Sequence, residues 1–210
     1  AIVVADGMGG LDDGHLAAAE TVRSMLDALD GPSTNWPSLV AQVNDSVRAS
    51  TSSTTDRNGA VAVGVRCSKD RVTVLHVGDT RAYRLRDGRV QQLTRDHSVA
   101  EAMADLGVRR GDSDLEARQL AAVTGYFGAA GSADEFSVHE LTIRAGDRLV
   151  LTTDGVHAVI GLAEWHEVGA LAGAGAAADR LVELAVQAGS ADDCTAVVSD
   201  LTLTDQDGPA

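Results

Sequence analysis

Two hydrophobic patterns divide this 210-residue chain into strand-like and helix-like stretches. The first strand-like run, Ile2–Ala5, is apolar and β-branched, and it is predicted to end in a turn at Asp6-Gly7. Apolar residues then recur at helical spacing over Leu16–Leu29, and a second helix is predicted over Pro37–Ser50, with its proline in the first turn. The chain is therefore predicted to begin with a strand followed by two helices.

A strand-rich stretch follows a polar segment at residues 50–58. The predicted strands are Ala60–Cys67, Arg71–Val77, Ala82–Arg86 and Arg89–Leu93. The last two flank Asp87-Gly88, a dipeptide typical of two-residue hairpins. Closely spaced strands with such a turn favour antiparallel pairing.

The C-terminal half mixes helices and strands again. A helix is predicted over Val99–Leu106, and a strand pair over Glu135–Ile143 and Arg148–Thr152, followed by a helix at Leu171–Gln187 and a strand at Thr195–Leu203. Hairpins dominate over regular strand–helix alternation, so the predicted fold class is α+β, a mostly antiparallel sheet structure with helices on its faces. No repeat or linker interrupts the chain before a predicted flexible tail at residues 204–210.

Composition excludes several classes of protein. The 31 acidic residues outnumber the 17 lysines and arginines, and the net charge of −14 argues against nucleic acid or an anionic membrane as a partner. Cys67 and Cys194 cannot form a disulfide framework or a four-cysteine zinc site. No stretch approaches the roughly 18 to 20 apolar residues of a membrane span, and the sequence shows no secretory signal. We therefore expect a cytoplasmic monomer.

Aspartates lie at the ends of several predicted strands. Asp6, Asp79 and Asp154 each follow an apolar strand, and Asp192 precedes the last one. A single Asp-Gly pair is more often an ordinary turn, so the prediction depends on the set. Carboxylates at the ends of strands in one sheet can converge, and several converging negative charges need a cation. Ligands that are all oxygen suit Mg²⁺ or Mn²⁺.

Five motifs around these positions occur in a characteristic order: ADGMGG (5–10), GDTRAYRLRDG (78–88), LTRDHS (93–98), LTTDGV (151–156) and GSADDCT (189–195). In order and spacing they resemble the metal-dependent protein phosphatase family (PPM, the 2C type), in particular its bacterial serine/threonine branch. The resemblance covers Ile2 to Leu203, so residues 1–203 are interpreted as one catalytic domain. It implies a four-layer α-β-β-α sandwich of two antiparallel sheets flanked by helices, with a binuclear Mn²⁺ or Mg²⁺ centre at one end.

The resemblance also implies a role for individual residues. Asp6 would bridge the two metal ions, and Gly7 would bind one of them through its carbonyl. Asp154 and Asp192 would bind the second ion, and Asp96 a third, weaker one. Asp6, Asp154 and Asp192 are then the catalytic residues, acting through a metal-activated water that hydrolyses phosphoserine and phosphothreonine. The implied partners are phosphorylated proteins, namely a cognate Ser/Thr kinase and its substrates.

The sequence also departs from the family pattern. The family carries an Arg…Asn-Glu-Asp segment before the first strand, and we expect it in residues that precede this sequence. Ala158 stands where the family usually has aspartate, Asp193 where it usually has asparagine, and Gly59-Ala60-Val61 where it has a polar Gly-Thr-Thr. Two alternatives therefore stay open. One is a degenerate member that binds phosphoproteins without turnover, and the other is a phosphatase of anti-sigma-factor antagonists.

Other reactive residues have competing structural explanations. His97 could donate a proton to the leaving alcohol, but a structural role is favoured. His15 could orient ligands, although it also fits an ordinary helix start. Cys194 follows two acidic residues, which disfavours a thiolate and favours packing. Asp79 is expected to pair with Arg81 and to brace the strand turn.

Overall fold

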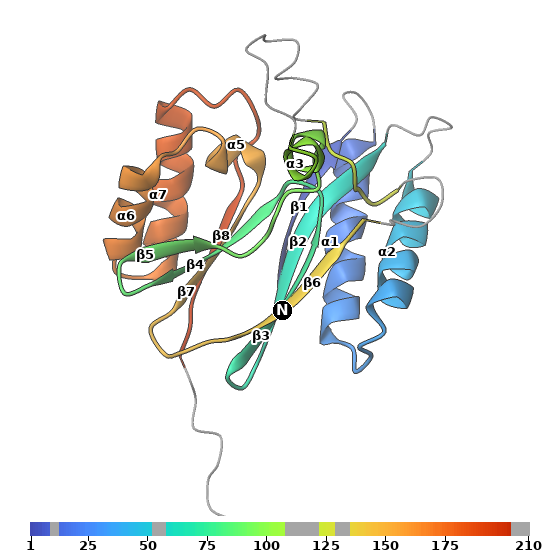
Figure 1. The fold of residues 1–210 in the computed structure, drawn as a ribbon, viewed down its shortest axis with the longest axis horizontal. Helices are drawn as coiled ribbons and strands as arrows, with labels where there is room; N and C mark the ends of the chain where they lie inside the picture. Colours follow the sequence, from blue (N-terminus) through green and yellow to red (C-terminus); the bar gives the residue numbers. More distant parts are fainter. Residues whose placement is uncertain (9–12, 52–57, 108–121, 129–134, 203–210) are drawn as a thin grey trace, which may run out of the picture.

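The protein is a four-layer sandwich in which two antiparallel sheets pack face to face and helices cover both outer faces (Figure 1). The computed structural model describes residues 1–8, 13–51, 58–107, 122–128 and 135–202. The predicted α+β sandwich is confirmed. The predicted tail at 204–210 and the Gly9-Gly10 pair lie outside the described residues.

The first sheet carries the N-terminal helices. Its strand order is β1-β2-β3-β6, and every neighbouring pair is antiparallel. The helices α1 and α2 pack beside each other, and α1 lies against β1 and β2. The elements are β1 (Ile2–Met8), α1 (Gly14–Asp30), α2 (Trp36–Ser50), β2 (Gly59–Ser68), β3 (Arg71–Val77) and β6 (Ser137–Thr142).

The second sheet has the strand order β5-β4-β7-β8 and is also antiparallel throughout. The helix α7 packs on β8, and α6 packs on α7. No helix in the described ranges is both long enough and apolar enough to span a membrane. The elements are β4 (Arg81–Arg86), β5 (Arg89–Gln92), α3 (Val99–Asp105), β7 (Arg148–Thr152), α5 (Asp154–His157), α6 (Leu162–Ala170), α7 (Ala174–Gln187) and β8 (Ala196–Asp200).

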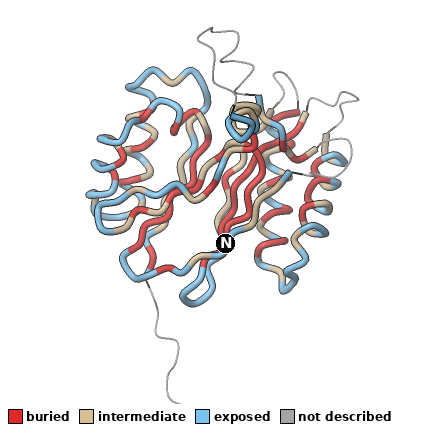
Figure 2. The backbone as a smooth tube through the Cα atoms, in the orientation of Figure 1, coloured by how far each residue is buried: buried red, intermediate tan, exposed pale blue. Residues whose placement is uncertain are grey.

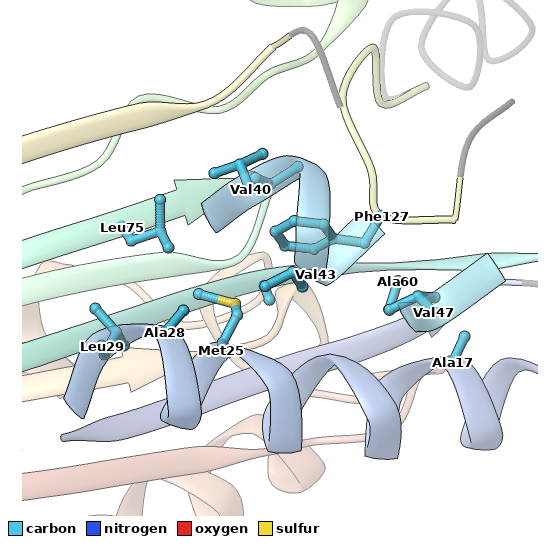
Figure 3. Close-up of a cluster of buried hydrophobic side chains, with 12 residues drawn as sticks. Ala17, Met25, Ala28, Leu29, Val40, Val43, Val47, Ala60, Leu75 and Phe127 are labelled. Carbon is cyan, nitrogen blue, oxygen red and sulfur yellow. The ribbon is translucent and has the colours of Figure 1, made fainter. Parts of the chain in front are cut away.

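Three apolar clusters hold the layers together, and the alternation of side chains along each strand produces them. In β2, Ala60 and Ala62 face the N-terminal helices, whereas Val63 and Val65 face the second sheet. The cluster under the N-terminal helices is shown in Figure 3. A third cluster, around Trp165, lies between the second sheet and its helices. Burial is therefore concentrated along the strands and on the inner faces of the helices (Figure 2).

The hairpin predicted at Asp87-Gly88 is present. Asp87 and Gly88 have φ values of 51° and 70°, as a two-residue turn with both central residues in the left-handed region requires. Arg86 and Arg89 face each other across the turn.

The predicted pairing of Glu135–Ile143 with Arg148–Thr152 is wrong. The first of these strands, β6, pairs with β3, whereas β7 pairs with β4 and β8, so the connection between them crosses from one sheet to the other. The buried Asp147 stabilises this crossing, because its carboxylate accepts hydrogen bonds from the Arg86 guanidinium and from the Arg144 backbone N–H. The connection is thus a sheet-to-sheet link, and it places Arg144 beside β4.

One strand boundary and one whole helix also differ from the prediction. The strand β1 continues through Asp6 and Gly7 to Met8, because these residues pair with β2. The helix α6 was not predicted. It begins at Leu162, after the N-cap residue Gly161, whose N–H donates to the Glu164 carboxylate, and it buries Trp165 and Val168.

Candidate metal centre

Four aspartates meet at one end of the sandwich. Asp6 belongs to β1, Asp79 follows β3, Asp154 begins α5, and Asp192 precedes β8. The strand β1 lies against β7 and β8 across the sandwich, which brings together side chains from both sheets. Burial, the largest cause, and nearby negative charges together raise the pKa of Asp6 to about 7. These charges belong to Asp154, Asp192, Asp79 and Asp193, which therefore lie close to Asp6.

Gly7 allows α1 to approach the site closely. A Cβ atom on Gly7 would lie 2.1 Å from the backbone oxygen of Gly14, the first residue of α1. No side chain fits in that space, so the backbone next to Asp6 stays bare and directly faces the helix. This explains why the Asp-Gly pair lies inside a strand and not in a turn.

Hydrogen bonds hold the Asp154 and Asp192 segments together. The Thr153 hydroxyl donates to the carbonyl of Asp193 at 3.2 Å and accepts from the N–H of Thr195 at 3.1 Å. The Thr153 N–H donates to the Thr195 carbonyl at 3.1 Å. These bonds join the end of β7 to the residues before β8, so Asp154 and Asp192 are positioned by one connected piece of backbone.

Among the described residues, no ion pair compensates these carboxylates, and the positive charge of Arg81 only partly offsets the rise in the pKa of Asp79. Burial raises the pKa of Asp79 to about 6, with Asp154 as the next cause, and burial together with Asp192 raises the pKa of Asp154. None of Asp6, Asp79, Asp154 and Asp192 forms an ion pair within the described part of the chain. Asp6, Asp79 and Asp154 are half-buried and Asp192 is exposed, and half-buried carboxylates that lie this close together need a cation or protons.

The donor set fits a hard divalent cation. It consists of carboxylate oxygens and the backbone carbonyl of Gly7, which are ligands suited to Mg²⁺ and Mn²⁺. Among the described residues, no three His, Cys, Asp or Glu side chains by themselves form a group that could hold a metal ion. Water and substrate oxygens would therefore have to complete the coordination, as is usual for Mg²⁺.

Arg81 pairs with Asp96 and not with Asp79, so the predicted Asp79–Arg81 pair is wrong. The Arg81 guanidinium donates to both carboxylate oxygens of Asp96, at 2.9 Å from Nε and 2.7 Å from Nη2. Asp79 is left beside Asp154, and it therefore belongs to the carboxylate cluster. The sequence signal was present, because Asp79 follows an apolar strand as Asp6 and Asp154 do.

We expect Arg81→Gln to lower the free energy of unfolding by about 2 kcal/mol, because the half-buried Asp96 would lose its partner. Asp96→Asn in the same chain should recover part of that loss, since no charge is then left unpaired. Urea unfolding of the four proteins in this double-mutant cycle measures the coupling. A coupling free energy near zero would contradict the pairing.

His97 is a structural residue. Its Nδ1 accepts the Gly78 N–H at 3.1 Å, and its Nε2 lies 2.9 Å from the Ser137 hydroxyl. Since Nδ1 accepts, Nε2 carries the proton of the neutral ring. Burial also lowers the pKa of His97, so both ring nitrogens tie β3 to β6 and neither is free for proton transfer.

The remaining candidates fall outside the cluster or support it. His15 is exposed in the first turn of α1. The Cys194 thiol is half-buried and donates to the Gly155 carbonyl at 3.2 Å, which agrees with the packing role. Ala158 is exposed at the end of α5. Asp193 adds its negative charge to the environment of Asp6.

Residues 1–185 match the family model described as Protein phosphatase 2C. The chain belongs to the protein phosphatase 2C family. This agrees with the two-sheet sandwich and with the aspartates gathered at its end.

Individual phosphatase 2C proteins show similarity over most of the chain. The serine/threonine protein phosphatase PstP of Mycobacterium tuberculosis is 28% identical over 209 residues, which cover 95% of this chain and 40% of PstP. The PPM Ser-Thr phosphatase MsPP of Mycobacterium smegmatis, solved with cacodylate, is 30% identical with a TM-score of 0.77 over 95% of this chain and 87% of that one. The PstP catalytic domain, solved with two manganese ions, is 26% identical with a TM-score of 0.77, covering 94% and 86%. The chain thus spans less than half of full-length PstP.

Proposed function

We propose that residues 1–203 form the catalytic domain of a metal-dependent serine/threonine protein phosphatase. The observation that carries this proposal is the cluster of Asp6, Asp79, Asp154 and Asp192, in which burial and mutual repulsion raise the pKa values of Asp6, Asp79 and Asp154. A phosphate monoester is itself an anion, and an acidic site can bind one only if cations lie between them. Membership in the phosphatase 2C family supports the same reaction.

The proposed cofactor is a pair of Mn²⁺ or Mg²⁺ ions held by Asp6, the Gly7 carbonyl, Asp154 and Asp192. The two manganese ions in the PstP catalytic domain support this assignment. When bound, the cations would activate water for in-line attack and neutralise the phosphoryl oxygens. A third ion at Asp96 would have to compete with the bidentate Arg81, which is consistent with a weaker site.

Residues of the chain hold the proposed ligands in position and keep the His157 imidazole of α5 uncharged. After burial, the negative charge of Asp154 is the largest cause of the raised pKa of Asp6, so the two sheets bring these two carboxylates close together. Thr153 fixes the segment that carries Asp192. The buried His157 stays neutral, because burial lowers its pKa to about 3, and its Nδ1 lies 3.0 Å from the Thr152 hydroxyl. A protonated imidazole at this position would repel the metal ions.

The proposed substrates are proteins that carry phosphoserine or phosphothreonine, with a cognate Ser/Thr kinase and its targets as partners. The names of the relatives support this substrate class. We further propose that the protein acts as a cytoplasmic monomer.

Purified protein should hydrolyse p-nitrophenyl phosphate and a phosphothreonine peptide in Mn²⁺ and should lose both activities in EDTA, with recovery on addition of Mn²⁺. The assay measures released phosphate as a function of Mn²⁺ concentration. Folded protein that binds the phosphopeptide without releasing phosphate at any Mn²⁺ concentration would refute the enzymatic proposal in favour of the degenerate, binding-only alternative.

A further inference from the structure

A basic pocket of about 640 Å³ lies beside the β4–β5 hairpin of this otherwise acidic chain. Four arginines and one acidic residue, Asp87, line it, so the lining has a net positive charge; the arginines are Arg84, Arg86, Arg89 and Arg144. These four residues belong to a total of only 17 lysines and arginines in a chain of net charge −14. Arg144 comes from the connection between the two sheets, so the pocket is assembled by the tertiary fold and not by a run of basic sequence.

Two of the four arginines are committed to the fold. Arg86 forms a bidentate ion pair with the buried Asp147. Arg84 donates to the Gln91 side chain and, at 3.3 Å, to the Thr142 carbonyl. Both are held in place along β4, so their positive charge is fixed in the wall of the pocket.

The other two arginines have unused donors. The side chains of Arg89 and Arg144 are exposed, and neither makes an ion pair or a side-chain hydrogen bond within the described residues. Arg148, on the opposite side of the hairpin, is different: its guanidinium donates to Asp200 and to the carbonyls of Val168 and Leu171. The pocket therefore presents two free guanidinium groups next to two fixed ones.

We propose that this pocket binds an acidic segment of the phosphoprotein substrate, which gives the phosphatase a docking site away from its metal centre. Guanidinium groups match carboxylates in planar, two-point hydrogen bonds. The net charge of −14 disfavours the binding of long polyanions such as nucleic acid, which would also meet the acidic surface around the pocket. A short run of Glu or Asp can contact the pocket without meeting that surface. The proposal rests on the proposed function, because it assigns a substrate feature to that enzyme.

The position of the pocket sets the spacing between the acidic segment and the phosphorylated residue. Arg81, at the start of β4, holds Asp96 near the carboxylate cluster, whereas Arg86 lies at the other end of the strand. Figure 1 shows β4 running from the region of α5 toward the hairpin. Five steps of about 3.3 Å separate these ends by about 17 Å. An extended substrate would span this distance in about five residue steps, so its acidic run would begin at least about five positions from its phosphorylated residue.

The test compares phosphothreonine peptides that carry four glutamates, or four glutamines, six residues before or after the phosphorylated residue. The wild-type chain should prefer one glutamate peptide over its glutamine counterpart by about tenfold in kcat/KM, mainly through KM. R89E/R144E should abolish this preference and leave hydrolysis of p-nitrophenyl phosphate unchanged. R48E/R71E is the matched control, because it changes the net charge equally at exposed arginines outside the pocket, and it should keep the preference.

Binding without turnover separates this proposal from the proposed function. A fluorescent, unphosphorylated glutamate peptide should bind wild type and R48E/R71E but not R89E/R144E, and the binding should weaken with salt. Such binding without hydrolysis of any peptide would refute the phosphatase activity and retain the docking site. Equal kcat/KM for all peptides, equal loss in both double variants, or tighter binding of a single-stranded oligonucleotide at this pocket would overturn the docking proposal.

Discussion

Asp6→Asn should lower kcat for Mn²⁺-supported phosphate hydrolysis by about a thousandfold. Asp6 interacts electrostatically with each of the other three carboxylates, since Asp154, Asp192 and Asp79 each raise its pKa. It is therefore the group best placed to lie between two cations. An asparagine keeps the shape of the side chain but removes the charge and one ligand oxygen, so both ions would be bound more weakly.

The same variant should make the metal-free protein more stable at pH 8. The pKa of Asp6 is raised from 3.8 to about 7, so the folded state binds this proton more tightly than the unfolded state does. Its contribution is fully favourable below about pH 4 and is lost as the pH rises through about 7. Wild-type protein in EDTA should lose stability over this window, and Asp6→Asn should lose less.

Urea unfolding in EDTA at pH 5 and pH 8 measures this difference, and phosphate release in Mn²⁺ measures the activity. Asp70→Asn is the control, because Asp70 is exposed in the turn between β2 and β3, and it should change neither quantity. An Asp6→Asn protein that is inactive and also less stable than wild type at pH 8 would indicate a damaged fold and would count against the metal-bridging role.

Gly155→Ala should lower kcat by about a hundredfold and reduce the free energy of unfolding by about 1 to 3 kcal/mol. A Cβ atom on Gly155 would lie 2.4 Å from the backbone oxygen of Asp193 and 3.3 Å from the carbonyl carbon of Asp192. The segment that carries Asp192 would have to move away from Asp154. A shift of about 1 Å between ligands of one centre is enough to produce a loss of this size.

Gly175→Ala provides the matched control. A Cβ atom there meets nothing within 4 Å, and the residue lies in the first turn of α7. The change should leave kcat unaltered and raise stability by up to about 1 kcal/mol, because alanine favours helix more than glycine does. Phosphate release and thermal unfolding of both variants give the comparison. Full activity in Gly155→Ala would show that the Asp192 segment can shift without disturbing the centre.

Local patterns predicted most elements of the fold but not all of their partners. The helices α1 and α2 and the hairpin at Asp87-Gly88 follow from residues close together in sequence. The pairing of β6 does not, because its partner β3 lies far away along the chain and the connection that follows β6 crosses to the other sheet, where Asp147 holds it. The sequence does not predict the helix α6, because its apolar residues stabilise it through tertiary contacts. Trp165 packs on Tyr83, and the helix packs on α7.

For the candidate site too, the sequence indicates some residues, whereas other contacts follow only from the structure. The order of motifs along the chain is enough to indicate Asp6, Asp154 and Asp192 as candidate ligands. The partner of Arg81 could not be chosen from sequence, because Asp79 is the nearer acidic residue along the chain and Asp96 the one with the right geometry in space. The roles of the aspartates as metal ligands stay predictions, which the Mn²⁺ and EDTA experiments test.

The amino-acid sequence alone is enough to predict aspartates close to several strands, a large negative charge and the motif order of a phosphatase 2C protein. These properties are local or additive, so they can be read residue by residue. By contrast, the packing of the two sheets places Asp79 in the carboxylate cluster and brings four arginines to one pocket, and neither follows from the order of residues. Burial and Coulomb forces depend on distance in space and not on separation along the chain. That distance is set by which sheet each strand enters.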